Sequence, residues 1–194
     1  MKIIEQYKKI NQLIEKASSI FVVGHKDLDL DALGGCLSMY SYVSTKKNEV
    51  YVIVDDVRTE KAVSKVIKEV SDTIKFIKGE HAITLKNQGS LLIILDTNKD
   101  YLLQNDNLNQ AFDNKIVIDH HGEGEGTIHD SLLIIDNEAS STCEMMTEFL
   151  KLNNFVIDSY LATILLSGII LDTNNYVLKT DSNTFYYSYY LTTC

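Results

Sequence analysis

Residues 115–122 read KIVIDHHG, and this stretch decides the prediction of the fold. Three consecutive β-branched residues, 116–118, are typical of a strand buried on both faces of a parallel sheet. Asp119, His120 and His121 follow where such a strand would end. Ligands of open parallel sheets bind beyond the carboxyl ends of the strands, so these three side chains are candidates for metal binding or acid–base chemistry. Taken alone, the triplet is better explained as a polar strand end before a glycine turn.

The composition narrows the class of protein. A chain of 194 residues, 45% of them hydrophobic, suits one globular domain with a substantial core. The net charge of −9 and the lack of a basic patch disfavour a long nucleic-acid partner. Three widely spaced cysteines, Cys36, Cys143 and Cys194, favour reduced thiols in a cytoplasmic protein. The longest apolar run, 161–171, is too short for a bilayer, which needs roughly 20 residues, so we expect no membrane contact by this chain.

Strand and helix patterns alternate along the chain. Strands are expected within 19–24, 49–54, 91–95, 116–118 and 131–135, with a short edge strand within 72–79. Helices are expected over 1–18, 32–43, 58–70, 105–112, 141–152, 159–170 and from 182 onward, and residues 81–89 are left unassigned. The alternation predicts a three-layer α/β fold with a mainly parallel sheet flanked by helices.

Polar clusters follow three of the expected strands. The first is HKDLDLD at 25–31, in which His25, Asp29 and Asp31 are spaced H-x-x-x-D-x-D, and the others lie at 96–98 and 119–121. Because the carboxyl ends of parallel strands share one edge of the sheet, we expect the clusters to meet there. Asp29 or Asp31 is also a plausible helix N-cap, but one cap does not explain several aspartates and a histidine together.

Together the clusters predict a metal centre. Its candidate ligands include Asp172 from a second LDTN at 171–174, and together they are four carboxylates and two imidazoles: Asp29, Asp31, Asp96, Asp172, His25 and His120. This mixture suits Mn²⁺ or Fe²⁺, with Mg²⁺ less favoured because of the histidines. Two divalent ions would neutralise the four carboxylates, which would otherwise repel one another. Two metals about 3.5–4 Å apart form a clamp for in-line phosphoryl displacement by a water deprotonated near neutral pH.

Five motifs resemble those of the DHH phosphoesterases, in the family's order. They are HKDLDLDALGG (25–35), LDTN (95–98), IDHHG (118–122), EASSTCE (138–144) and SGIILDTNNYVLKTDSNTF (167–185). The resemblance covers residues 19–190, nearly the whole chain. Within the superfamily the chain looks most like the cyclic-di-AMP phosphodiesterases of the GdpP type, chiefly at 25–26, 139–142 and 168–173.

The resemblance implies a role for each site residue. His25 and Asp29 would hold a first metal, Asp31, His120 and Asp172 a second, and Asp96 would bridge both. Asp119 and His121 would be the catalytic pair, with Asp119 orienting its neighbours and His121 facing the scissile phosphate. Ser140, Ser141 and Thr142 would line the phosphate side of the cleft. The cofactor would be two divalent ions, with Mn²⁺ as the first choice.

The implied activity is hydrolysis of a cyclic dinucleotide, cyclic-di-AMP, to the linear dinucleotide. An alternative within the superfamily is a short-oligonucleotide phosphodiesterase or adenosine-bisphosphate phosphatase. An alternative of another class is a non-catalytic sensor that binds metal or nucleotide. Degenerate sensors usually lose ligands, and all six are present here.

The chain also departs from the family pattern. Related enzymes often carry arginines after the DHH triplet, where this chain has GEGE at 122–125, which weakens capture of an anionic substrate. The C-terminal DHHA1 domain, with its glycine-rich substrate motif, is missing, as are upstream membrane helices. We therefore expect residues 1–194 to be the DHH catalytic lobe of a longer protein. The lobe would lie in the cytoplasm even if the whole protein is membrane-anchored, and both a monomer and a homodimer remain open.

Overall fold

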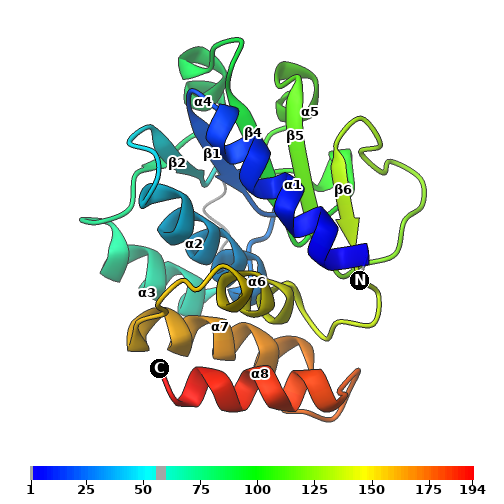
Figure 1. Cartoon of the computed structure of the whole chain (residues 1–194). Helices are drawn as coiled ribbons and strands as arrows, with labels where there is room; N and C mark the ends of the chain where they lie inside the picture. Colours follow the sequence, from blue (N-terminus) through cyan, green and yellow to red (C-terminus); the bar gives the residue numbers. More distant parts are fainter. Residues whose placement is uncertain (1, 56–59) are drawn as a thin grey trace.

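The computed structural model describes residues 2–55 and 60–194. Within them a six-stranded sheet has the order β3-β2-β1-β4-β5-β6, and every neighbouring pair is parallel (Figure 1). The strands are β1 (Ile20–Val23), β2 (Val50–Ile53), β3 (Phe76–Ile77), β4 (Leu91–Leu95), β5 (Asn114–Asp119) and β6 (Leu132–Ile135).

Helices cover both faces of the sheet because the strand residues alternate between two apolar clusters. In β1, Ile20 and Val22 belong to one cluster, whereas Phe21 and Val23 belong to the other. The first face is covered by α1 (Lys2–Lys16), α2 (Leu30–Ser44), α3 (Lys61–Val70) and α6 (Thr142–Leu152). The second is covered by α4 (Gly79–Leu85), by Leu103 after the 3₁₀ helix η1 (Asp100–Leu102) and by α5 (Leu108–Ala111).

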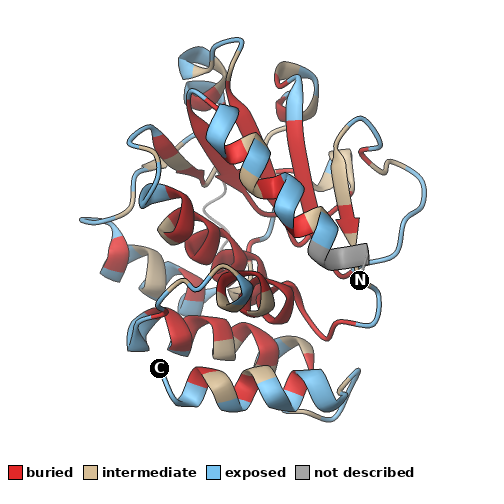
Figure 2. Ribbon diagram, viewed as in Figure 1, coloured by how far each residue is buried: buried red, intermediate tan, exposed pale blue. Residues whose placement is uncertain are grey.

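Two C-terminal helices form an outer tier. Helix α7 (Ser159–Asp172) packs on α2 and α6, and α8 (Ser182–Thr192) packs on α6 and α7 (Figure 1). The colouring by burial shows the central strands and α2 enclosed, whereas α8 is exposed along much of its length (Figure 2).

The structure confirms the three-layer α/β fold with a parallel sheet. The unassigned residues 81–89 fall partly in α4, a short helix whose sequence has little apolar periodicity. The helix expected over 58–70 is described from Lys61, and its first two residues lie outside the described ranges. All three cysteines are free. In the described residues we find no helix with the length and apolar character required to span a membrane.

The strand order creates a crevice at the centre of the sheet. From β1 the chain moves outward through β2 to β3, then returns to place β4 on the other side of β1 and continues to β6. Such a reversal leaves an opening between the carboxyl ends of the two central strands, where α/β proteins bind ligands. His25 follows β1 and Asp96 follows β4, so both lie at this opening.

Candidate metal centre

The first ligand group joins the ends of β1 and β4. The Nε2 atom of His25 lies 3.4 Å from Asp96 Oδ2 and 3.6 Å from Asp29 Oδ2. Asp29 is also the N-cap of α2, since its Oδ1 accepts hydrogen bonds from the amides of Asp31 and Ala32. The cap and the ligand use different oxygens, so both interpretations of Asp29 fit the structure.

The second group joins α2, the end of β5 and the end of α7. The Nε2 atom of His120 lies 3.1 Å from Asp172 Oδ2 and 3.9 Å from Asp31 Oδ2. Asp31 is fully buried, and its two oxygens accept hydrogen bonds of 2.8 Å from the amides of Thr142 and Cys143 at the start of α6. Unpaired amides at a helix N-terminus favour an anion, which explains how this carboxylate is held in the core.

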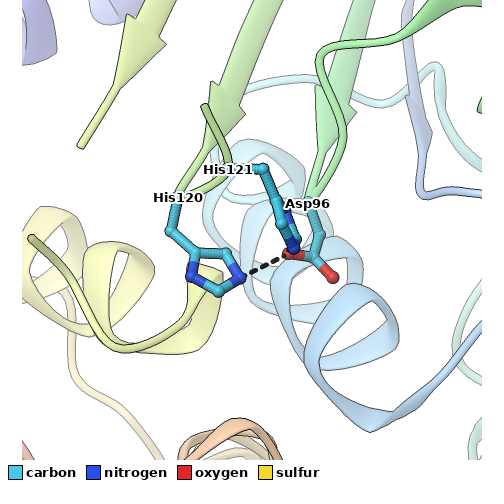
Figure 3. Close-up of side chains that lie close together, drawn as sticks. All are labelled: Asp96, His120 and His121. Carbon is cyan, nitrogen blue, oxygen red and sulfur yellow. Dashed lines mark ion pairs between the residues drawn. The ribbon is translucent and has the colours of Figure 1, made fainter. Parts of the chain in front are cut away.

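Asp96 lies between the two groups. Its Oδ2 faces His25, and its Oδ1 lies 3.3 Å from His120 Nε2 (Figure 3). Its backbone is left-handed, with φ of 62°, a conformation that aspartate tolerates better than most residues and that ends β4 here. The Thr142 hydroxyl donates a 2.9 Å hydrogen bond to Oδ1. Two imidazoles from different strands therefore approach different oxygens of one carboxylate.

His121 belongs to a third arrangement. Its Nδ1 lies 2.8 Å from Asp119 Oδ1, and its main-chain amide donates to the same oxygen. Asp119 is fully buried, and its Oδ2 accepts a 2.6 Å hydrogen bond from Asn98 Nδ2. Because Nδ1 is engaged with Asp119, the Nε2 of His121 is the ring nitrogen left to face the cavity that this side chain lines.

The two histidine rings lie close together, although side chains of adjacent residues on an extended backbone point to opposite sides. Their ring centroids are 4.2 Å apart, and both rings approach Asp96 Oδ1, at 3.3 Å from His120 and 3.8 Å from His121 (Figure 3). Strand β5 ends at Asp119, so the alternation of a pleated strand no longer governs these residues. Asp96, His120 and His121 also lie close enough to hold a metal, which keeps open a ligand role for His121.

The electrostatics of the cluster favour a cation. Burial lowers the pKa of His25, but contacts with Asp29 and Asp96 outweigh it and raise the pKa to about 11. For His120, contacts with Asp172 and Asp96 likewise outweigh burial and raise the pKa to about 10. Burial, then repulsion from Asp96, raises the pKa of Asp31 well above its usual value. Protons are thus retained where positive charge is needed.

Two observations other than the pKa values also fit a metal centre. His120 Nε2 is buried and makes no hydrogen bond, although carboxylate oxygens lie around it. In the part of the chain that the structure describes, three groups of side chains place possible ligand atoms within 4.8 Å of one another: His25, Asp29 and Asp96; Asp31, His120 and Asp172; and Asp96, His120 and His121. The first two groups match the assignment of residues to a first and a second metal that the family resemblance implies. The roles of these residues as metal ligands stay predictions.

The predicted substrate contacts Ser140, Ser141 and Thr142 do not line the cavity. All three are buried behind the carboxylates. The Ser140 hydroxyl bonds to Glu144, the Ser141 hydroxyl caps α6, and Thr142 supports Asp96 and Asp31. This placement supports the ligands and gives no support to a substrate contact.

Two further residues at the site had no assigned role in the sequence prediction. Asn98, fully buried, bonds to Asp119, to the main-chain oxygen of His121 and, through its Oδ1, to the Thr127 hydroxyl. Its place in the 96–98 cluster was the available signal. The second is Lys179, whose Nζ lies 3.1 Å from His120 Nδ1 and 3.2 Å from the His120 carbonyl oxygen. Its place in the fifth motif, 167–185, was the available signal.

Comparisons with known proteins show which proteins this chain resembles. The DHH family, N-terminal domain, is matched over residues 19–169. The chain is 32% identical over 189 residues to the cyclic-di-AMP phosphodiesterase GdpP of Bacillus subtilis. This match covers 94% of this chain and 29% of that protein. The chain is 27% identical over 157 residues to the bifunctional oligoribonuclease and PAP phosphatase NrnA of Thermus thermophilus, covering 81% and 44%.

Among solved structures, an exopolyphosphatase-related protein from Bacteroides fragilis superposes with a TM-score of 0.81 at 22% identity. The match covers 97% of this chain and 56% of that one, and at this identity it supports the fold alone. The chain thus spans less than a third of the length of the GdpP relative and about half of that structure.

Proposed function

The chain belongs to the DHH family, and we propose that it is the catalytic lobe of a metal-dependent phosphodiesterase that hydrolyses cyclic-di-AMP to the linear dinucleotide. The observation that carries the proposal is the position of Asp96, whose two oxygens face His25 and His120 at 3.4 and 3.3 Å. One carboxylate shared between two ligand groups suits a pair of metals. The 32% identity to GdpP supports the choice of substrate.

His25, Asp29 and Asp96 would hold one ion, and Asp31, His120, Asp172 and Asp96 the other. Mn²⁺ is our first choice, because carboxylates mixed with imidazole suit it, with Fe²⁺ and Mg²⁺ as alternatives. A bound pair of divalent ions supplies Lewis acidity toward the phosphoryl oxygens and lowers the pKa of the attacking water.

The other residues of the site position the side chains of His121 and Asp96, and His121 is also a donor to the substrate. Asp119 fixes the ring of His121 through Nδ1, and Asn98 fixes Asp119 in turn. His121 Nε2 then faces the cavity, where it can donate a hydrogen bond to the phosphate or a proton to the leaving oxygen. Thr142 holds Asp96 from behind the cluster, so the shared carboxylate is oriented before any ligand arrives.

A panel of substrates tests the proposal. Wild-type protein with Mn²⁺ is given cyclic-di-AMP, a short oligonucleotide and adenosine 3′,5′-bisphosphate, and products are separated by chromatography. We expect preferential conversion of cyclic-di-AMP to the linear dinucleotide. Preference for the oligonucleotide or the bisphosphate would favour an activity like that of NrnA instead, which the 27% identity to NrnA of Thermus thermophilus supports. No turnover with both metals bound would favour the non-catalytic sensor.

We further propose that the whole protein contains a second lobe that closes over the site. The GdpP relative is more than three times the length of the matched region, which leaves room for such a lobe. The metal cluster provides one wall of a cleft, and positioning of a substrate requires contacts from more than one side. A homodimer is an alternative source of the second wall, and the sedimentation of the chain would distinguish the two.

A further inference from the structure

A cavity of about 400 Å³ lies beside the metal ligands. It is lined by His25, Asp29, Asp96, Thr97, Asn98, Lys99, Tyr101, Leu102, Asp119, His121 and Asp172. Four of these residues are aspartates, so before metals bind the cavity is unfavourable for a phosphate-bearing ligand. Among the described residues that line it, Lys99 has the only lysine or arginine side chain.

Lys99 is held in place without being neutralised. Its side chain is half-buried, and its Nζ donates a 2.8 Å hydrogen bond to the Thr127 hydroxyl. That hydroxyl is itself fixed, because it accepts from the Gly124 amide and lies 3.1 Å from Asn98 Oδ1. No carboxylate of the described residues forms an ion pair with Lys99. An ammonium has three donors, so two remain for a ligand.

The loop after the DHH triplet cannot take over this role. Its charged residues, Glu123 and Glu125, are acidic and exposed. The loop is fastened to Lys99 by a β-bridge between Lys99 and Thr127 and by the hydrogen bond from the Asp100 amide to the Gly126 carbonyl. It therefore sets the position of the lysine and contributes no cation of its own.

The ammonium of Lys99 lies beside the candidate metal ligands and not among them, since its hydrogen bond is to Thr127 and it forms no ion pair with Asp96 or another carboxylate of the described residues. Lys99 lies three positions after Asp96, so the Cα atoms of the two residues are at most about 11 Å apart. The reacting phosphate would lie against the ligands around Asp96. An ammonium elsewhere on the wall of the same cavity can then bind another phosphate of the same molecule.

We propose that Lys99 binds the phosphate of a dinucleotide that is not being cleaved, and so selects substrates with two phosphates over those with one. The inference rests on the proposed function, since it takes the reacting phosphate to be held by the metals. A charge-assisted hydrogen bond of this kind changes affinity by about 10- to 100-fold.

Calorimetric titration with Mn²⁺ present tests this without relying on turnover. The probes are two phosphorothioate-linked adenosine dinucleotides that resist hydrolysis, one with a 5′-phosphate and one without. We expect Lys99→Met to weaken binding of the first about 10- to 100-fold and of the second less than about threefold. Lys99→Arg should restore most of the difference. Lys75→Met is the matched control, since Lys75 precedes β3 at the opposite, amino edge of the sheet.

Thr127→Val tests the contribution of the hydroxyl that positions the Lys99 ammonium. It keeps the ammonium but removes the hydroxyl that holds it, and we expect a smaller loss, of about threefold, for the doubly charged probe. Equal weakening of both probes by Lys99→Met, or no weakening of either, would overturn the proposal. Failure of wild-type protein to hydrolyse cyclic-di-AMP while these affinities behave as expected would reject the proposed substrate and leave the role of Lys99 standing.

Discussion

Gly168 lies on α7, and a methyl group added there by Gly168→Ala should weaken metal binding strongly while it lowers the stability of the fold only modestly. A Cβ atom built on Gly168 would lie 2.5 Å from Cys143 Sγ, 2.9 Å from Asp31 Oδ1 and 3.0 Å from Asp31 Cα. Favourable non-bonded contacts lie near 3.5–4.0 Å, so Gly168→Ala must move α7 and α2 apart by about 1 Å. Asp172 lies one turn later on α7, and its distance from Asp31 should grow with that shift.

The change in the free energy of unfolding caused by Gly168→Ala is the sum of two opposing effects. Overpacking a buried contact costs about 1–3 kcal/mol, and replacing a helical glycine with alanine returns up to about 1 kcal/mol. The free energy of unfolding should therefore fall by about 0–3 kcal/mol. Disturbing the support of a metal ligand typically costs about 10- to 100-fold in metal affinity, and we expect that loss for the second ion only.

Gly34→Ala is the matched control. Its Cβ would also meet Cys143 Sγ, at 2.6 Å, but its next neighbour is Ile164 at 3.4 Å rather than Asp31. We expect a similar loss of stability and a change in metal affinity of less than about threefold. Adding Cys143→Ala should relieve Gly34→Ala fully and Gly168→Ala only in part, because Asp31 remains in the way.

Stability is measured by urea unfolding in a chelator, and metal affinity by titration of Mn²⁺ against a competing fluorescent indicator. Equal losses of metal affinity in the two alanine variants would refute the reasoning, since they would show that general loosening of the helices, and not contact with Asp31, weakens the second site. Unchanged affinity in Gly168→Ala with reduced stability would refute it as well.

Three further predictions concern the ligands and the pH. Asp96→Asn should reduce the metal content from two Mn²⁺ per chain to at most one weakly held ion, and unchanged stoichiometry by elemental analysis would reject the bridging role. His120→Ala should lower both metal occupancy and rate, whereas His121→Ala should keep both metals and lose rate by roughly 10²–10⁴-fold; an emptied second site in a crystal structure of the latter would reverse the assignment. The pKa values of His25 and His120 are raised to about 11 and about 10, so both rings hold protons that a metal must displace. Because the two rings belong to different ligand groups, the logarithm of the Mn²⁺ affinity of each site should rise by about one per pH unit between pH 6 and 9, and pH-independent affinity would contradict this.

The sheet was predictable because its strands are short apolar runs that end in charged residues. Runs such as 91–95 are buried throughout, as a parallel strand between two helical layers must be. Helix α4 was missed since a seven-residue helix with one face against the sheet shows too few turns for periodicity to be read.

The meeting of the candidate ligand residues was predictable for the same reason as the strands, because parallel topology brings strand ends together without knowledge of side-chain contacts. The supporting residues were not. Asn98 matters through hydrogen bonds to partners 21 and 29 positions away in the chain, and Thr142 through one to a partner 46 positions away. Which polar side chain turns inward at a strand end depends on those distant partners, and the linear pattern does not specify them.

The way in which Asp31 is held has a consequence for how this protein can evolve. Its partners are main-chain amides, so side-chain replacement at position 143 leaves the donor intact, and the position can drift without the carboxylate losing its partner. Proline is the exception, because it lacks the amide hydrogen. Thr142 is the first residue of α6, where helices accept proline readily, and the extended backbone of Ser141 suits a residue that precedes one. A single codon change there would keep the helix but remove both the amide that bonds to Asp31 and the hydroxyl that bonds to Asp96, which gives a lineage a short route to a folded protein whose candidate metal ligands have lost part of their support.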